Sequence, residues 1–165
     1  MTVLRRIQPA LLPLAALAAT LTLAACSMGG FGGGSGASIP LAPGLSARMD
    51  QPGASLDRAQ AIAMVNAYRA NNGLPALTPD AGLDGTAQAL ADQYARTGTP
   101  PTTPQELAGM KLSAGYATFA ETFSGWRNNP ADAAGMTTNA TRAGIAASFN
   151  GTSTYGTYWV LVLGQ

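Results

Sequence analysis

The stretch Gly109–Met136, GMKLSAGYATFAETFSGWRNNPADAAGM, decides how the rest of the sequence is interpreted. Thr118 and Glu121 stand three positions apart, the spacing of a capping box in which two side chains accept hydrogen bonds from each other's backbone amides. A helix is therefore expected to begin at Thr118, after a loop or short extended segment over residues 111–117. That helix should end before Pro130, because the residue preceding a proline avoids the α region.

Aromatic residues follow the capping box at helical spacing and predict a buried face: Phe119, Phe123 and Trp126. Together with Trp159, Phe119 and Trp126 are interpreted as core. Tyr116 and Tyr155 stand in loop-like surroundings, so these two are the better candidates for exposed aromatic contacts with a ligand.

The N-terminus has the pattern of a secretory signal peptide over residues 1–25. Arg5 and Arg6 form a basic start, an apolar run follows, and small residues precede Cys26. The sequence Leu-Ala-Ala-Cys resembles a bacterial lipobox, in which the cysteine is acylated and becomes the first mature residue. Cys26 is the only cysteine, so an intramolecular disulfide is excluded and a free thiol is the alternative to lipidation.

The predicted partner of the N-terminus is therefore a membrane, through the lipid on Cys26. Ser27 follows, and in the lipoproteins that this start resembles a serine there accompanies outer-membrane sorting, which predicts a bacterial envelope protein facing the periplasm. Without Arg5 and Arg6, seven basic and eight acidic residues remain, and no basic run favours nucleic acid as a partner.

Composition divides the rest of the chain into a tether and a single domain. Residues 26–53 are rich in Gly, Ser, Ala and Pro and contain GGFGGGSG, which is typical of a flexible linker. Residues 54–165 are long enough for one hydrophobic core.

Helices are expected at three places before the aromatic stretch. The first covers residues 56–71 with Ser55 as N-cap and Asn72-Gly73 as a left-handed end. The second begins at Thr78, with Pro79 at its first position and Gly98 at its end. Thr103–Glu106 has capping-box spacing and predicts a short helical turn through Met110.

The C-terminal part predicts an antiparallel hairpin. Residues 142–149 alternate in polarity, Asn150-Gly151 begins a turn that can extend to Gly156, and residues 157–163 form the partner strand. The second strand is apolar on both faces, which indicates a sheet covered on both sides. The predicted fold class is α+β.

Four segments resemble the short bacterial branch of the CAP superfamily (cysteine-rich secretory proteins, antigen 5, pathogenesis-related 1). They are VNAYRANNGLPAL from Val65, GYAT from Gly115, RAGIA from Arg142 and YWVLVLG from Tyr158. The resemblance runs from the first helix to the last strand of the domain. It implies a three-layer α-β-α sandwich that ends in the hairpin.

Members of that family gather two histidines and two acidic residues in a cleft, often around a divalent metal. This chain has no histidine. By the same motifs, the glutamate after the family's glycine falls on Met110, and the histidine after its proline falls on Asp132. Glu121 lies one position from the helix glutamate, and Tyr116 borders the cleft. The resemblance thus implies a cleft with Met110, Tyr116, Glu121 and Asp132 but without metal, cofactor or catalytic residue.

Three functions stay open. The first is a lipid-anchored, non-catalytic CAP-like binding module of the envelope, with a lipid, peptide or glycan as ligand. The second is a weak, metal-independent hydrolase that uses the carboxylates of Glu121 and Asp132. The third is a purely structural lipoprotein. The lack of histidine argues against the enzyme, since no serine has an imidazole base.

Overall fold

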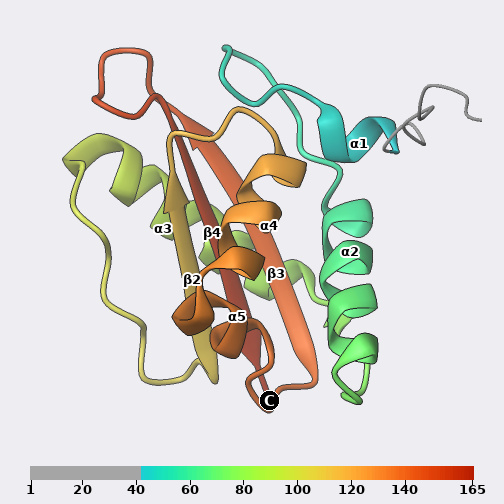
Figure 1. Ribbon diagram of the computed structural model, residues 1–165. Helices are drawn as coiled ribbons and strands as arrows, with labels where there is room; N and C mark the ends of the chain where they lie inside the picture. Colours follow the sequence, from blue (N-terminus) through green and yellow to red (C-terminus); the bar gives the residue numbers. More distant parts are fainter. Residues whose placement is uncertain (1–41) are drawn as a thin grey trace, which may run out of the picture. The chain divides into compact units, whose positions relative to one another are not determined.

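The structure, a computed structural model, describes residues 42–165 (Figure 1). The elements in chain order are α1 (Pro43–Ser46), α2 (Arg58–Asn71), β1 (Thr78–Pro79), α3 (Ala81–Thr97), β2 (Gly109–Ala114), α4 (Phe119–Asn128), α5 (Pro130–Met136), β3 (Arg142–Phe149) and β4 (Thr157–Gly164). The strands form one sheet in the order β1-β3-β4-β2. β4 pairs antiparallel with both β3 and β2, whereas β1 pairs parallel with β3.

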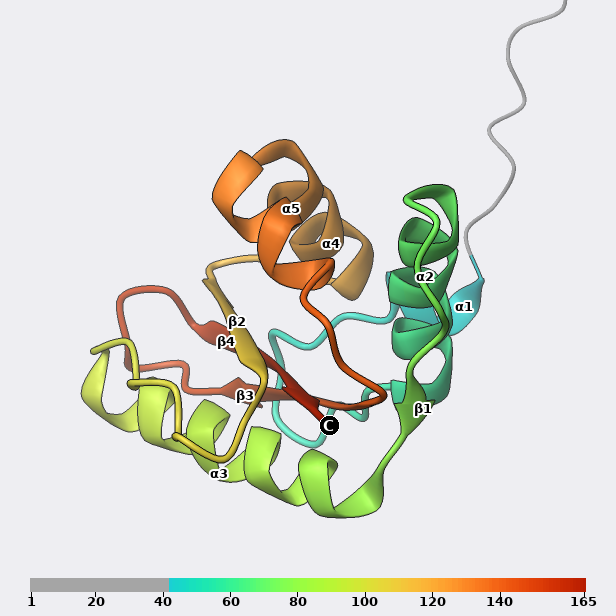
Figure 2. The ribbon, with the colours of Figure 1, turned by 90° about the horizontal axis from the view of Figure 1, so that it is seen from below.

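The sheet lies between two layers of helices, with α3 on one face and α4 and α5 on the other (Figure 2). One core joins α3 to the sheet through small and β-branched side chains: Ala87, Ala91, Ala146, Val160 and Val162. A larger core on the opposite face contains the aromatic residues Phe119, Trp126 and Trp159, each at most 1 % exposed. Every residue of β4 is buried. The predicted α-β-α sandwich and C-terminal hairpin are confirmed.

Helix α3 approaches β3 most closely at Gly144. A Cβ atom at this position would overlap the backbone of Leu83 and Asp84, including a distance of 2.5 Å to the Leu83 carbonyl oxygen. The carboxylate of Asp84 accepts a hydrogen bond from the Ile145 amide at 2.9 Å. The glycine of the RAGIA segment therefore lets a helix rest directly on the backbone of the sheet.

The first long helix begins two residues later than predicted. The N-cap of α2 is Asp57, not Ser55, and its side chain accepts from the Gln60 amide at 2.9 Å. An aspartate satisfies a free amide and also places negative charge at the positive end of the helix, so it is the stronger cap of the two candidates.

The second long helix also begins later than predicted, because Thr78 and Pro79 form a strand instead. The Thr78 amide donates to the Thr141 carbonyl at 2.8 Å, and the Asp80 amide donates to the Ala143 carbonyl at 2.9 Å. Asp80 then caps α3 by accepting from the Leu83 amide at 2.9 Å. Pairing with β3, more than 60 residues away, thus overrides the local helix start.

The short helical turn expected over residues 103–110 is absent from the described structure. A single turn contact joins the Leu107 amide to the Pro104 carbonyl, and strand β2 begins at Gly109. Met110 pairs with Val162 in the sheet. The predicted loop or extended segment over residues 111–117 agrees better with the structure, although strand β2 begins two residues before residue 111.

The packed part of the chain begins before Ala54, the residue at which the domain was expected to begin. Leu45 of α1 and Met49 are both buried in the larger core. The Met49 amide donates to the Ala117 carbonyl at 2.7 Å. The surrounding sequence is rich in glycine and proline and therefore resembles a tether. The domain nevertheless begins earlier than predicted, because these apolar side chains pack into its core. The expected signal peptide, Cys26 and the tether up to residue 41 lie outside the described residues. Within residues 42–165, no helix has the length and apolar character needed to span a membrane.

Candidate functional site

Met110 occupies the edge strand β2 and packs toward α3. Its side chain contacts the core between α3 and the sheet, next to Val162. Successive residues of a strand point to opposite faces, so Lys111 points to the α4–α5 face. Met110 therefore does not lie together with Asp132, its expected neighbour in the cleft.

Asp132, in the first turn of α5, forms an ion pair with Lys111. The Lys111 Nζ lies 2.8 Å from Asp132 Oδ1, and the two side chains are 15 % and 29 % exposed. The lysine also donates to the Ala131 carbonyl at 3.5 Å. Its methylene stem lies against Gly135, where a Cβ atom would overlap it. Lys111 is the only lysine of the chain, and sequence reasoning assigned it no role.

Glu121 forms the capping box that the sequence predicts at the start of α4. One of its oxygens, Oε2, accepts from the amides of Ala117 at 3.1 Å and Thr118 at 3.0 Å. The Glu121 amide in turn donates to the Thr118 hydroxyl at 3.3 Å. The Glu121 carboxylate therefore binds the backbone that precedes α4.

Tyr116 lies between β2 and α4 and is 39 % exposed, as its loop-like surroundings predict. Its ring lies over Gly125, because a Cβ atom there would stand 2.8 Å from the phenol oxygen. Its carbonyl accepts from the indole of Trp159 at 2.9 Å. Tyr116 thus has both a packing role and one exposed face.

The four predicted residues do not gather into one cluster. Met110 faces α3, Asp132 is paired with Lys111, and Glu121 binds two amides. Within residues 42–165, no group of three or more acidic or cysteine side chains stands close enough to hold a metal ion. Two separately engaged carboxylates are a poor donor set for zinc, which favours nitrogen and sulfur ligands.

The RAGIA and YWVLVLG segments lie in β3 and β4 of the sheet, and GYAT leads from β2 into α4. The family model described as CAP, cysteine-rich secretory protein family, matches residues 62–163. The chain belongs to this family. The match runs from α2 to the end of β4 and therefore includes the whole sheet.

Solved structures share the fold of this CAP domain at low sequence identity. A crystal structure of MpPR-1i soaked with selenourea has 19 % identity and a TM-score of 0.53, and the match covers 64 % of this chain and 87 % of that one. An outer surface protein from Borrelia burgdorferi has 17 % identity and a TM-score of 0.46, with 65 % and 90 % covered. No curated protein sequence matches the chain significantly. At such identities, the similarity to MpPR-1i bears on the fold alone.

Arg69 is a buried cation of the CAP domain that the sequence did not distinguish from a surface residue. It is 0 % exposed. Its guanidinium donates to four carbonyls: Pro75 at 3.1 Å, Met136 at 2.9 Å, Thr138 at 2.9 Å and Ala140 at 3.4 Å. Burial lowers the pKa of Arg69 from its ordinary value. The side chain ties α2 to the segment between α5 and β3. In the sequence, only the position of Arg69 in the VNAYR segment, which resembles the family, set it apart from a surface arginine.

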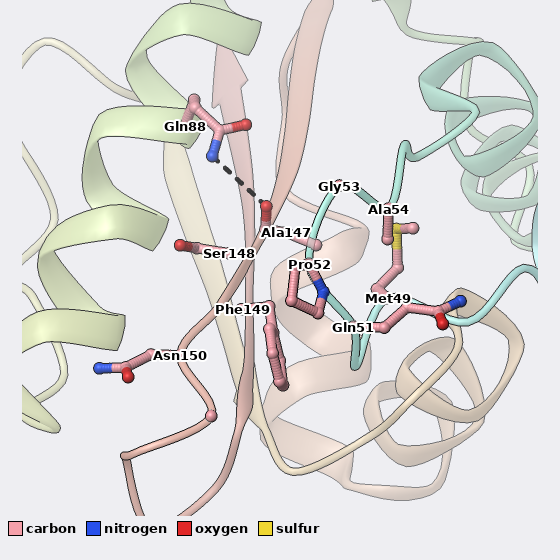
Figure 3. A pocket seen from close by; sticks show the side chains of 11 residues that line it. Met49, Gln51, Pro52, Gly53, Ala54, Gln88, Ala147, Ser148, Phe149 and Asn150 are labelled. Atoms are coloured by element: carbon pink, nitrogen blue, oxygen red, sulfur yellow. Dashed lines mark hydrogen bonds between the residues drawn. The ribbon is translucent and has the colours of Figure 1, made fainter.

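A hollow of about 450 Å³ opens beside the end of β3 (Figure 3). The loop over Gln51–Ala54 forms one wall, and Ala147–Gly151 form the other. Gln88 of α3 closes one side by donating to the Ala147 carbonyl at 3.3 Å. A second hollow of about 330 Å³ lies between α2 and α4, next to Tyr68 and Arg127. None of the four predicted cleft residues lines either hollow.

Proposed function

We propose that this chain is a lipid-anchored CAP domain of the bacterial cell envelope that binds a ligand without catalysing a reaction. Membership of the CAP family is the established part of this statement. The anchor and the non-catalytic role are the proposed parts, and each has its own support and its own test.

The Lys111–Asp132 ion pair carries the non-catalytic part of the proposal. Asp132 stands where the family resemblance places a histidine, and the nearby lysine occupies its carboxylate at 2.8 Å. A general acid or base must lie within hydrogen-bonding reach of a substrate proton. The other carboxylate, Glu121, is bound to two backbone amides. Both carboxylates thus already have partners within the protein, which supports a structural role for each.

The anchor is supported by the N-terminal sequence. A basic start, an apolar stretch and Leu-Ala-Ala before Cys26 match the order of a lipoprotein signal peptide. The near-neutral charge of the remaining chain provides no electrostatic attraction to an anionic membrane surface. Acylation would therefore provide the membrane attachment, and a multiply acylated terminus is a stable anchor.

Fractionation of cells that express the full chain tests the anchor. We expect the wild-type protein in the membrane fraction, with Cys26→Ser unprocessed or soluble and the neighbouring control Ser27→Ala still in the membrane. Membrane association of Cys26→Ser equal to that of the wild type would remove the lipoprotein part of the proposal.

A thermal-shift titration with zinc and calcium tests the non-catalytic part. We expect no change in the melting temperature, because binding to the native state alone would raise it. A saturable rise that Asp132→Asn abolishes would restore a metal site at α5 and overturn the proposal. Asp92→Asn, on α3 and thus across the sheet from α5, is the matched control.

A further inference from the structure

The loop between β3 and β4 stands over the C-terminal end of α3 (Figure 1). A small polar hollow of about 270 Å³ lies between them, and none of the four residues of the expected cleft lines it. Its walls come from the last turn of α3 and from the loop: Ala95, Arg96, Thr97, Gly98, Asn150, Thr152, Ser153, Thr154, Tyr155 and Tyr158.

The side chain of Tyr158 in the wall of this hollow has an unsatisfied hydroxyl group. Tyr158 is 0 % exposed, and its phenol oxygen has no hydrogen-bond partner within the described residues. A buried polar group without a hydrogen-bond partner lowers the stability of the fold. The unpaired hydroxyl group of Tyr158 in the wall of a hollow therefore needs an explanation. A ligand hydroxyl that reaches this oxygen would supply the missing hydrogen bond.

Two other tyrosines pack against the ring of Tyr158. The ring of Tyr158 stands edge-on to Tyr94 at 4.7 Å and to Tyr155 at 6.4 Å between centroids. Burial raises the pKa of the Tyr94 phenol, and the phenols of Tyr158 and Tyr155 raise it further. Tyr155 is 55 % exposed and therefore presents an aromatic face to solvent.

The loop that carries Tyr155 is held in place by hydrogen bonds. Asn150 donates from its amide to the Ala95 carbonyl of α3 at 2.8 Å and accepts from the amide and hydroxyl of Thr152 at 3.1 and 2.8 Å. The Ser153 hydroxyl donates to the Asn150 carbonyl at 2.7 Å and accepts from the Gly156 amide at 3.2 Å. The hollow is thus preformed, which lowers the entropic cost of binding.

We propose that this hollow binds one ring of a saccharide, which stacks on Tyr155 and offers a hydroxyl group to Tyr158. A sugar ring combines an apolar C–H face, suited to an aromatic ring, with hydroxyl groups that both donate and accept. Hollows for drug-sized ligands begin at about 300 Å³, so a volume of about 270 Å³ suits one ring at the end of a glycan.

Other ligand classes fit the hollow less well. No carboxylate lines it, so it lacks the charged oxygen ligands that calcium prefers. Arg96 is its single cation, and the neighbouring end of α3 is a helix C-terminus, which carries partial negative charge and disfavours an anion. An acyl chain needs an apolar lining, whereas threonine, serine and asparagine dominate here. The inference rests on the proposed binding role and names its ligand class.

Titration of the purified chain with glucose, N-acetylglucosamine and glycerol, followed by NMR of the backbone amides, tests the inference. We expect saturable shifts with at least one sugar at residues 95–98 and 150–158, and none with glycerol, which has hydroxyl groups but no ring. Tyr155→Ala should weaken the sugar's affinity about tenfold, because it removes the stacking face. Tyr158→Phe keeps the ring and should weaken affinity roughly threefold or more, since it removes one hydrogen bond.

Tyr68→Ala is the matched control, because it removes a tyrosine of α2 that does not line this hollow and should leave the sugar's affinity unchanged. Circular dichroism of each variant checks that it folds. Two outcomes would overturn the inference: no saturable binding of either sugar, or equal losses in the Tyr68 and Tyr155 variants. The membrane-fractionation and metal experiments do not involve the hollow, so failure of the sugar site is distinguishable from failure of the proposed function.

Discussion

Substitution of Gly144 by alanine tests whether direct contact between α3 and β3 determines the stability of the domain. The added Cβ would overlap the backbone of Leu83 and Asp84, and a distance of 2.5 Å would separate it from the Leu83 carbonyl oxygen. A flexible side chain could rotate away from such an overlap, but a helix backbone cannot. The variant can fold only if α3 moves away from the sheet.

The cost of that movement can be estimated from two contributions. Overpacking of a well-packed core costs roughly 1–3 kcal/mol and sometimes more. Separation of α3 from the sheet also strains the hydrogen bond from the Ile145 amide to the Asp84 carboxylate, worth about 1 kcal/mol. We expect a loss of about 2–4 kcal/mol, a large part of the roughly 5–15 kcal/mol that typically stabilises a domain.

Gly85, on the outer side of α3, provides a matched control. A Cβ atom there meets nothing within 4 Å. Gly85→Ala should therefore stabilise the domain by about 0.5–1 kcal/mol, because alanine is the better helix former. Both variants change one glycine of the same α3–β3 unit to alanine, so the difference between them reports the contact alone.

Urea unfolding followed by circular dichroism measures both free energies. For a domain of this size, the expected loss corresponds to a fall of roughly 10–20 °C in the melting temperature of Gly144→Ala. A Gly144→Ala protein within about 1 kcal/mol of the wild type would refute the reasoning, because it would mean that α3 can shift without the cost of overpacking.

Two further predictions concern charged side chains. The Leu83 amide and the Arg142 guanidinium hold the pKa of the Asp80 carboxyl below its usual range. A lowered native pKa stabilises the fold above the unfolded pKa and loses this effect as pH falls through the native value. Asp80→Asn should thus be less stable than the wild type at pH 7, and in urea unfolding this difference should shrink as the pH falls through the native pKa of Asp80. A difference that does not change with pH would contradict this. Arg69→Met should lower the free energy of unfolding by about 3 kcal/mol or more, because several buried carbonyls lose their hydrogen-bond donor. Arg69→Lys should not restore this stability, since an ammonium group cannot span the four acceptors. Rescue by lysine would show that charge alone matters there.

Local patterns predicted several parts of the molecule correctly. The capping box of α4, the left-handed glycine after α3 and the C-terminal hairpin all depend on residues close together in the sequence. The apolar character of residues 157–163 likewise predicted that β4 lies between two layers. The candidate site fared less well. The exposed Tyr116 was found where it was expected, but the ion pair of Asp132 was not anticipated.

The remaining features depend on contacts that no local pattern encodes. Thr78 forms a strand because its amide reaches the Thr141 carbonyl, and Met110 lies in a strand because β4 pairs with it. Arg69 resembles a surface cation in the sequence, yet its guanidinium donates hydrogen bonds to carbonyls of a segment about 70 residues away.

The sequence by itself therefore determined the capped start of α4, the hairpin, the resemblance to the family and the lack of histidine. Only the tertiary structure decided which residues meet: Lys111 with Asp132, Gly144 with α3, and Tyr158 with the hollow beside Tyr155. The physical reason is how far apart in the sequence the interacting residues stand. A cap or a turn is satisfied within a few residues, whereas an ion pair or a sheet register forms only when distant segments pack together.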